Sequence, residues 1–387
     1  MLHASTARPS LSSVPATDTP RTLLGGLSPA QFMRRHWQKK PLLIRAAIPD
    51  FAPLLSRQQL FEMAADEAVE SRLIVRKPQG WTLKQGPLSR AQLPPVKQAG
   101  WTLLVQGVDQ HLDAAHALLQ QFRFVPDARL DDLMISWASE GGGVGPHFDS
   151  YDVFLLQATG QRRWRIGRQK DLSLQPDVPL KILSHFEPEE AFLLNPGDML
   201  YLPPKWAHDG DAVGADCSTY SIGFRAPQRG GLAGELLQRI ADEFEDHTLY
   251  RDPQQPATAT PAAMPATLEA FAADALQRLL AERASLACAL GEVMTEPKPR
   301  VWFDEAQSDW VPGALRLDRR TRMMYDERHV FINGESFRAG GADARLMRAL
   351  ADQRGLDQRQ VARASEGALA LLQDWFDAGW LKTVEQD

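Results

Sequence analysis

The stretch Gly141–Gly167, GGGVGPHFDSYDVFLLQATGQRRWRIG, determines how the rest of the chain is interpreted. At its centre, His147 and Asp149 stand two residues apart in a segment that predicts a β-strand. Successive side chains on a strand point to opposite faces, so both groups point the same way. A histidine and a carboxylate presented together, with one more histidine, form the facial triad that holds iron(II) and leaves coordination positions open. His208, in GDMLYLPPKWAHDGD, is the candidate for this third ligand.

The ligand set favours iron over zinc. Two neutral imidazoles and one carboxylate on one face leave positions for a bidentate cosubstrate and dioxygen. Zinc is the alternative, since it also accepts two histidines and an acid. His208 lies 59 residues beyond Asp149, after an Asn-Pro-Gly-Asp turn and a short strand, and the glycines before His147 lack side chains that would crowd a ligand. These features together predict a metal site rather than isolated surface residues.

The segment RRWRI that begins at Arg162 predicts an anion site. Strand alternation puts Arg162 on the same face as Trp164 and Ile166, which should be interior. An interior arginine is costly without an anionic partner. The distal carboxylate of a keto acid such as 2-oxoglutarate fits the arginine fork, while a structural acid or a solvated basic patch is the alternative. Three hydroxyl groups could add donors, although each alone fits a structural role: Ser136, Tyr220 and Ser221.

The composition is that of a soluble globular protein, with 387 residues, 44% hydrophobic and 24% charged. The 43 basic and 49 acidic residues argue against general nucleic-acid binding and would attract a basic protein. Two distant cysteines, Cys217 and Cys288, form neither a disulfide framework nor a zinc spacing, so we expect a reducing, cytoplasmic setting. No apolar run approaches the roughly 20 residues that span a bilayer, so no membrane partner is expected.

The chain divides by pattern into four regions. Residues 1–22 predict a solvated tail, favoured over a transit peptide, and 23–227 a mainly β catalytic domain with additional helices. Many short strands between turn signals indicate a small barrel or jelly roll, whose open mouth can surround a metal. Residues 228–296 predict apolar-faced helices that need the barrel or a second subunit to bury against, and 297–387 a winged-helix-like domain.

Turn signals and hydrophobic periodicity predict the bounds of several strands and helices within these regions. Tyr151–Gly167 predicts a hairpin with its turn at Ala158-Thr159-Gly160-Gln161, and Leu180–Glu187 a further strand. Leu268–Met294 predicts one helix after a Pro/Ala/Thr-rich connector. The closing domain predicts a hairpin at Asn333-Gly334 and two helices: Asp343–Gln353 and Ser365–Phe376.

Two motifs in combination, PHFDSYDVFLLQATGQRRWRIG and GDMLYLPPKWAHDG, resemble the JmjC-type 2-oxoglutarate oxygenases, specifically the bacterial ribosomal oxygenases. The resemblance covers most of the chain, beginning with WQKKPLLIR near the N-terminus. It implies a double-stranded β-helix (a JmjC/cupin-like jelly roll), a helical dimerisation region and a C-terminal winged helix. It also implies a homodimer that uses iron(II), 2-oxoglutarate and dioxygen to hydroxylate an arginine of a large-subunit ribosomal protein, the sixteenth.

The resemblance also implies residue roles. The family's iron ligands fall on His147, Asp149 and His208. The distal carboxylate of the cosubstrate falls on Arg162, where many related oxygenases have lysine, and Ser136 matches a further pocket position. Glu140, just before the glycine run, is the candidate partner for the substrate guanidinium at the pocket mouth.

Two other functions fit parts of the pattern. One is a cupin-like metal enzyme of another class, such as an isomerase. The other is a non-catalytic interaction protein that uses the winged helix. A winged helix often reads DNA, but the acidic balance favours a protein contact, so no sequence-specific nucleic acid is expected. The intact ligand set and Arg162 favour an active oxygenase.

Overall fold

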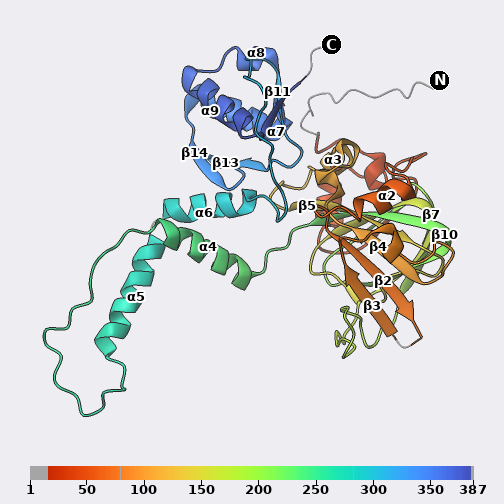
Figure 1. Ribbon diagram of the computed structural model, residues 1–387, viewed down its shortest axis with the longest axis horizontal. Coiled ribbons are helices and arrows are strands. Elements are labelled where there is room, and N and C mark those ends of the chain that lie inside the picture. Colours follow the sequence, from red (N-terminus) through yellow and green to blue (C-terminus); the bar gives the residue numbers. More distant parts are fainter. Residues whose placement is uncertain (1–15, 79, 282, 385–387) are drawn as a thin grey trace. The chain divides into compact units, whose positions relative to one another are not determined.

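The computed structural model describes residues 16–78, 80–281 and 283–384 (Figure 1). They form two compact units. One holds residues 16–226 together with Pro299–Trp302, and the other holds Pro227–Lys298 and the chain from Phe303 onward. The first corresponds to the predicted catalytic domain, whereas the second joins the predicted helical region and winged-helix-like domain in one body.

The first unit is built on a ten-stranded antiparallel sheet with the order β1-β9-β7-β10-β5-β4-β2-β3. Beside this path, β6 pairs with β10 and β8 pairs with β7. The strands are β1 (Leu42–Ile44), β2 (Ser71–Lys77), β3 (Gly80–Gln85), β4 (Trp101–Val105), β5 (Leu130–Ala138), β6 (His147–Phe148), β7 (Val153–Gly167), β8 (Glu190–Leu194), β9 (Met199–Leu202) and β10 (Ala207–Phe224).

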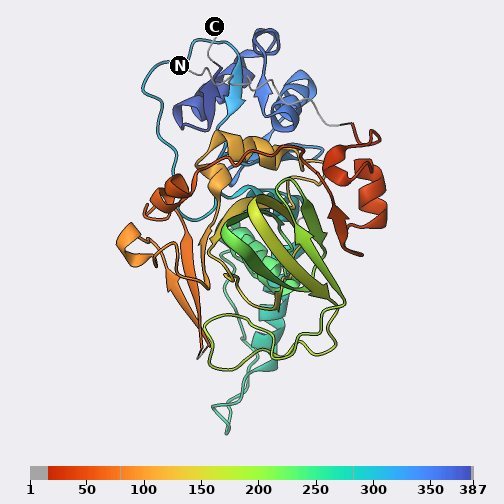
Figure 2. The ribbon, with the colours of Figure 1, turned by 90° about the vertical axis from the view of Figure 1, so that its right-hand side faces the viewer.

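The long strands β7 and β10 lie side by side, in yellow-green and green in Figure 2. The predicted hairpin within Tyr151–Gly167 is wrong, because β7 runs through the expected turn as one strand. Gly160 has a φ of +60° and a Cβ on it would lie 3.0 Å from the carbonyl oxygen of Asp216 in β10, which has a φ of +62°. The two strands therefore bulge together instead of reversing. The predicted strand over Leu180–Glu187 is also wrong, since the segment contributes one bridge, from Leu183 to Leu174.

The two faces of the central strands bury different side chains. The larger core lies on one face and includes Ile135, Phe154, Tyr220 and Ile222. Short helices pack into this core: η1 (Thr22–Leu24), α1 (Pro29–Arg35), α2 (Arg57–Met63), η3 (Val108–Gln110) and α3 (Asp113–Gln120). A further short helix, η2 (Arg90–Gln92), has no buried residue. The smaller core, on the opposite face, lies inside the curl of the sheet and includes Leu155, Trp164, Ile166, Leu194 and Leu200.

The N-terminal helix begins where the sequence predicts. The Ser28 side chain accepts the N–H of Gln31, and the Gln31 side chain accepts the N–H of Ser28, which is a capping box at the start of α1. Hydrogen bonds reach further back than the predicted end of the tail at residue 22. The N–H of Ala30 donates to the Thr17 carbonyl over 3.0 Å. Residues 1–15 of the predicted tail lie outside the described residues.

The second unit opens with α4 (Arg229–Glu243), α5 (Ala266–Ala281) and α6 (Arg283–Thr295). The single helix predicted over Leu268–Met294 is thus α5 and α6, described on either side of residue 282. A Cβ on Gly291 would lie 2.4 Å from the Phe331 ring, so glycine allows α6 to approach the winged-helix strands closely. The Thr295 hydroxyl also accepts the N–H of Gly334 over 3.2 Å. These contacts join α6 to the winged helix. Among the described residues, no helix has the length and apolar character needed to cross a membrane.

The winged-helix part contains two three-stranded sheets and three helices. Its elements are β11 (Leu315–Leu317), β12 (Met323–Tyr325), β13 (His329–Ile332), β14 (Glu335–Arg338), α7 (Gly341–Gln353), β15 (Gly355–Leu356), α8 (Gln358–Val361), α9 (Glu366–Asp377) and β16 (Leu381–Thr383). The predicted hairpin at Asn333-Gly334 is confirmed. Both residues have positive φ, +48° and +90°, as a tight turn between β13 and β14 requires. The two predicted helices correspond to α7 and α9.

Candidate metal centre

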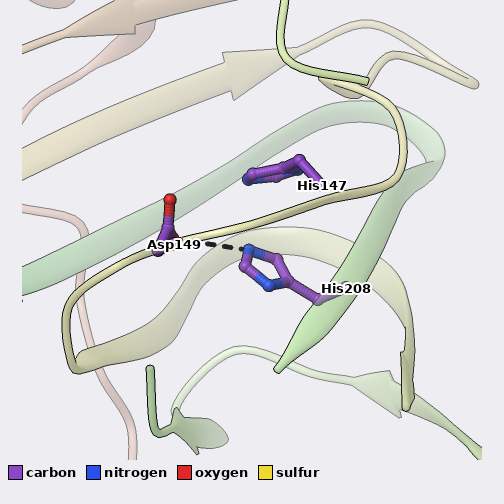
Figure 3. A group of neighbouring side chains, drawn as sticks. All are labelled: His147, Asp149 and His208. Carbon is purple, nitrogen blue, oxygen red and sulfur yellow. Dashed lines mark ion pairs between the residues drawn. The ribbon is translucent and has the colours of Figure 1, made fainter. Parts of the chain in front are cut away.

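The three candidate ligands meet where β6 and β10 pair (Figure 3). His147 in β6 lies opposite His208 in β10, and Asp149 follows two residues after His147. The potential ligand atoms all lie within 4.8 Å of one another. His208 Nε2 is 3.6 Å from Asp149 Oδ2, and the two imidazole centroids are 4.2 Å apart. The fold thus brings the predicted triad together from two distant segments.

Each imidazole is oriented by a backbone carbonyl that lies just before its strand. His147 Nδ1 lies 2.8 Å from the carbonyl oxygen of Gly145, and His208 Nδ1 lies 2.9 Å from that of Trp206. A carbonyl oxygen only accepts, so Nδ1 carries the proton in both rings. In the neutral form of each ring, Nε2 therefore presents a bare lone pair, the state in which an imidazole binds a metal.

Burial, together with the neighbouring His147, lowers the pKa of His208 to about 4. The ring is therefore neutral at physiological pH, as a metal ligand must be. With no proton on Nε2, the close approach to the Asp149 carboxylate sets two electron-rich atoms against each other. A divalent cation held by both groups would relieve that repulsion. Two imidazole nitrogens and one carboxylate suit iron(II), with zinc as the alternative.

Arg162 lies on the same inward face of β7 and β10 as His208, which we call the interior wall, and is further from the metal centre. Ile166 of β7 pairs with His208, and Arg162 pairs with Ala212, four residues or about 13 Å further along β10. The Arg162 side chain is 3% exposed, and its Nε and Nη2 atoms have no hydrogen-bond partner. The alternative of a structural acid bound to these two atoms is not present among the described residues. An anion between Arg162 and the metal centre would satisfy the buried guanidinium.

Strand register separates the three predicted hydroxyl donors. Ser221 pairs with Leu155, which belongs to the smaller interior core, and Ser136 pairs with Thr219, two residues before Ser221. Both serines therefore share the face of the triad and Arg162. The Ser136 hydroxyl donates to the Thr219 carbonyl over 3.3 Å, so in this state it offers an acceptor rather than a donor.

Tyr220 lies on the opposite face, and the prediction that it joins the pocket is wrong. Its ring packs against Phe51 in the larger core, and its hydroxyl accepts the N–H of Leu54 over 2.9 Å. Adjacent strand residues point to opposite faces, so Tyr220 and Ser221 cannot both line one pocket.

The glycine run is explained by backbone packing. A Cβ on Gly142 would lie 2.4 Å from the Trp101 carbonyl oxygen, and one on Gly143 would lie 2.4 Å from the Gly210 carbonyl oxygen. The expectation that the glycines keep space open for a ligand is therefore wrong for Gly142 and Gly143, where backbone atoms fill that space. Glu140, just before them, has an exposed side chain, and its carbonyl accepts the N–H of Gly100 over 2.9 Å.

Sequence reasoning missed one neighbour of Asp149. Partial burial, together with the negative charge of Asp149, raises the pKa of Tyr151 above its usual value. The Tyr151 hydroxyl is therefore neutral at physiological pH and can serve as a donor near that carboxylate. The two-residue spacing from Asp149 was the signal that could have identified it.

Two apolar side chains that pack on the segment before His147 were also missed. A Cβ on Gly145 would lie 2.8 Å from both Trp81 of β3 and Ile182. Gly145 supplies the carbonyl that orients His147, so these side chains pack against the residue that positions that ligand. No sequence signal connects such distant segments.

Two family models match the chain. One, described as a JmjC domain, matches residues 117–232, and the other, described as a ROXA-like winged helix, matches residues 277–382. The first contains the triad and Arg162. The second includes all of α6, in agreement with the packing of that helix on the winged-helix strands.

Curated relatives and solved structures agree with these models. The chain is 38% identical over 234 residues to the Ribosomal protein uL16 3-hydroxylase of Escherichia coli, covering 60% of this chain and 61% of that protein. It is 37% identical over 227 residues to a Probable ribosomal oxygenase of Haemophilus influenzae, covering 58% and 56%. The alignments therefore span less than two thirds of these relatives. The structure of YcfD, an E. coli ribosomal oxygenase, in complex with cobalt and 2-oxoglutarate matches with a TM-score of 0.77 and 30% identity, over 91% of this chain and 97% of that one.

These matches confirm the predicted fold class. The catalytic unit has the double-stranded β-helix of a JmjC/cupin-like jelly roll, and the second unit contains a winged helix. An X-ray structure of E. coli YcfD matches with a TM-score of 0.81 over 92% of this chain and 98% of that one. With the metal-ligand cluster lying inside the matched JmjC domain, the chain belongs to the JmjC-type ribosomal oxygenases of bacteria.

Proposed function

We propose that this chain is an iron(II)- and 2-oxoglutarate-dependent oxygenase that hydroxylates an arginine side chain of uL16, the sixteenth large-subunit ribosomal protein. The observation that carries the proposal is that the triad and Arg162 lie together on one interior wall. Neither the isomerase-like alternative nor a non-catalytic role accounts for the unpaired atoms of the buried guanidinium.

The residues divide the work between metal and cosubstrate. His147, Asp149 and His208 would hold iron(II) on one face. When bound, iron(II) with 2-oxoglutarate and dioxygen supplies the oxidation that converts a C–H bond to C–OH, with succinate and carbon dioxide as coproducts. Arg162 would bind the distal carboxylate of 2-oxoglutarate and so orient it toward the metal. Ser136 and Ser221 share this wall and would line the cosubstrate pocket.

A basic ribosomal protein suits the charge of the chain. The net charge of −6 favours encounter with a basic partner. Glu140, exposed beside the strand that leads to the triad, offers a carboxylate that matches a guanidinium fork. The name of the E. coli relative identifies uL16 as that protein's substrate. Such a substrate would be met in the cytoplasm.

The second unit supports protein contacts rather than DNA reading. In a helix-turn-helix arrangement, the second helix enters the DNA groove. Here α9 takes that position after α8, and its sequence EGALALLQDWFD has acidic residues and no Lys or Arg. Exposed leucines on α4–α6 would be covered in a homodimer: Leu237, Leu268, Leu276, Leu280, Leu286 and Leu290.

Mass spectrometry of ribosomal proteins tests the proposal. The full chain is incubated with iron(II), 2-oxoglutarate and ribosomal proteins from cells that lack the endogenous enzyme. We expect one added oxygen on an arginine of uL16, with no modification by the His208→Ala control. Oxygen on another residue type would overturn the arginine assignment. Absence of both a modified protein and 2-oxoglutarate turnover would overturn the oxygenase assignment.

A further inference from the structure

Trp164 lies on the interior wall between Arg162 and the metal centre. The Trp164 ring centroid is 5.7 Å from that of His208, and the Arg162 guanidinium carbon lies 5.6 Å from the centroid of the Trp164 ring. Trp164 pairs with Gly210 of β10, and a Cβ on Gly210 would lie 2.6 Å from a carbon of the indole. The indole therefore occupies space that exists only because residue 210 is glycine.

The indole N–H of Trp164 is a buried donor without a partner. The side chain is 5% exposed, and Nε1 has no hydrogen-bond partner. A buried tryptophan N–H usually finds an acceptor. Nε and Nη2 of Arg162, two residues earlier on the same face of β7, are unpaired as well. Three unpaired donor nitrogens on neighbouring inward positions favour a ligand with several acceptor oxygens.

We propose that Trp164 is a positioning residue for Arg162 and that its indole N–H donates to the dicarboxylate bound by Arg162. The proposal rests on the proposed function, since it assumes that 2-oxoglutarate binds at this wall. The face of the indole attracts the guanidinium and limits its side-chain freedom. Gly210 completes the arrangement because it leaves room for the ring. The identity of residue 210 thereby affects cosubstrate binding without touching the cosubstrate.

Calorimetric titration separates this role from a structural one. The full chain is loaded with Mn(II) without oxygen and titrated with 2-oxoglutarate, and the Mn(II) affinity is measured separately. Trp164→Phe keeps a ring but removes the N–H, Trp164→Leu removes both, and Gly210→Ala displaces the ring. Trp310→Phe is the matched control, because Trp310 is 6% exposed and its Nε1 is also without a partner, but it belongs to the winged-helix core.

We expect Trp164→Phe to weaken 2-oxoglutarate binding about tenfold, the loss of one hydrogen bond to a charged group. Trp164→Leu should weaken it about 100-fold, because the contact with the guanidinium is lost as well. Gly210→Ala should weaken 2-oxoglutarate binding by an amount between those of the two Trp164 variants. Mn(II) affinity should stay within about twofold of the wild-type value in all three, and Trp310→Phe should match the wild type.

Two results would overturn the inference while leaving the proposed function intact. One is wild-type 2-oxoglutarate affinity in the Trp164 variants. The other is a parallel loss of Mn(II) affinity, which would mean that the ring only supports His208. If Trp164→Leu fails to fold, Trp164→Phe and Gly210→Ala decide the outcome. If the wild-type protein loaded with Mn(II) binds no 2-oxoglutarate, the proposed function is overturned and this inference with it.

Discussion

His147 and His208 lie opposite each other in the antiparallel pairing of β6 and β10, with their imidazole centroids 4.2 Å apart. Side chains opposite each other in such a pair lie on one face, and a slip of one residue would turn one ligand away. Because β6 has only two residues, the register needs support beyond it. The N–H of Lys205, three residues before His208, provides it by donating to the Asp149 carbonyl over 2.7 Å.

Replacing His208 with alanine should abolish turnover and metal binding while the chain stays folded. Loss of one of three ligands leaves too few donors to hold the ion. Metal content after dialysis, turnover and circular dichroism measure the three effects. His185→Ala, at an exposed position outside the triad, is the control and should behave as the wild type. Full iron content and activity in His208→Ala would exclude this residue as the third ligand.

Replacing Arg162 with alanine should raise the 2-oxoglutarate concentration needed for half-maximal turnover about 100-fold. The expected cost is about 3 kcal/mol, since a charged hydrogen-bond partner is lost from a buried site. Steady-state assays at varied 2-oxoglutarate concentration measure the change. Arg163→Ala is the matched control, because Arg163 is adjacent but exposed on the other face of β7. Equal cosubstrate dependence in the two variants would place the carboxylate site elsewhere.

The sequence predicts the ligand cluster well because its signals are local. His147 and Asp149 share a face by alternation, and the same rule makes Arg162 interior. That rule, applied to Tyr220 and Ser221 as neighbours, would also have shown that only one of them can line the pocket.

The errors come from tertiary contacts. The turn expected near Gly160 becomes a bulge because Asp216, far away in sequence, bulges opposite it. The packing of Gly291 on Phe331, which makes α6 part of the winged-helix unit, likewise leaves no local signal.

The protein should be a dimer at micromolar concentration, because exposed leucines on α4–α6 favour burial against a second copy. Leu276 and Leu280 are 57% and 51% exposed on α5. The double substitution Leu276→Glu and Leu280→Glu should shift the mass measured by light scattering to that of a monomer, because apposed charges oppose association. Gln277→Glu, at an exposed position on the same helix, should leave the dimer intact. A wild-type monomer would refute the prediction.

Asp318 should stabilise the winged-helix unit in a pH-dependent way. Burial alone would raise the pKa of Asp318, but hydrogen bonds from Arg320 and Lys382 outweigh burial and hold that pKa below its usual value. Because the folded-state pKa is the lower one, the stabilisation is present above about pH 4, the unfolded-state value, and is lost as the pH falls further.

Asp318→Asn should therefore reduce the stability of this unit by about 3 kcal/mol at pH 7, since two cations lose their buried partner. Hydrogen exchange of peptides from β11 and β16 measures the loss. The difference in stability between Asp318→Asn and the wild type should shrink below pH 4. Asp309→Asn, at an exposed position in the same unit, is the control. A difference that stays constant across this range would rule out the charge of Asp318 as its cause.

Glu140 should affect the protein substrate and not the cosubstrate. Its carboxylate is exposed next to Gly141, where a Cβ would meet nothing within 4 Å, so a substrate side chain has room to approach. A carboxylate that pairs with an arginine fork contributes about 1.5–3 kcal/mol. Glu140→Ala should therefore raise the half-saturating concentration of a uL16 peptide about 10- to 100-fold and leave that of 2-oxoglutarate unchanged. Glu140→Gln, which keeps the shape but not the charge, should weaken peptide binding nearly as much.

Glu62→Ala, which removes an exposed acid on α2, is the control for a general change in net charge. If Glu62→Ala weakens peptide binding as much as Glu140→Ala does, overall charge attracts the substrate and Glu140 makes no specific pair with its guanidinium.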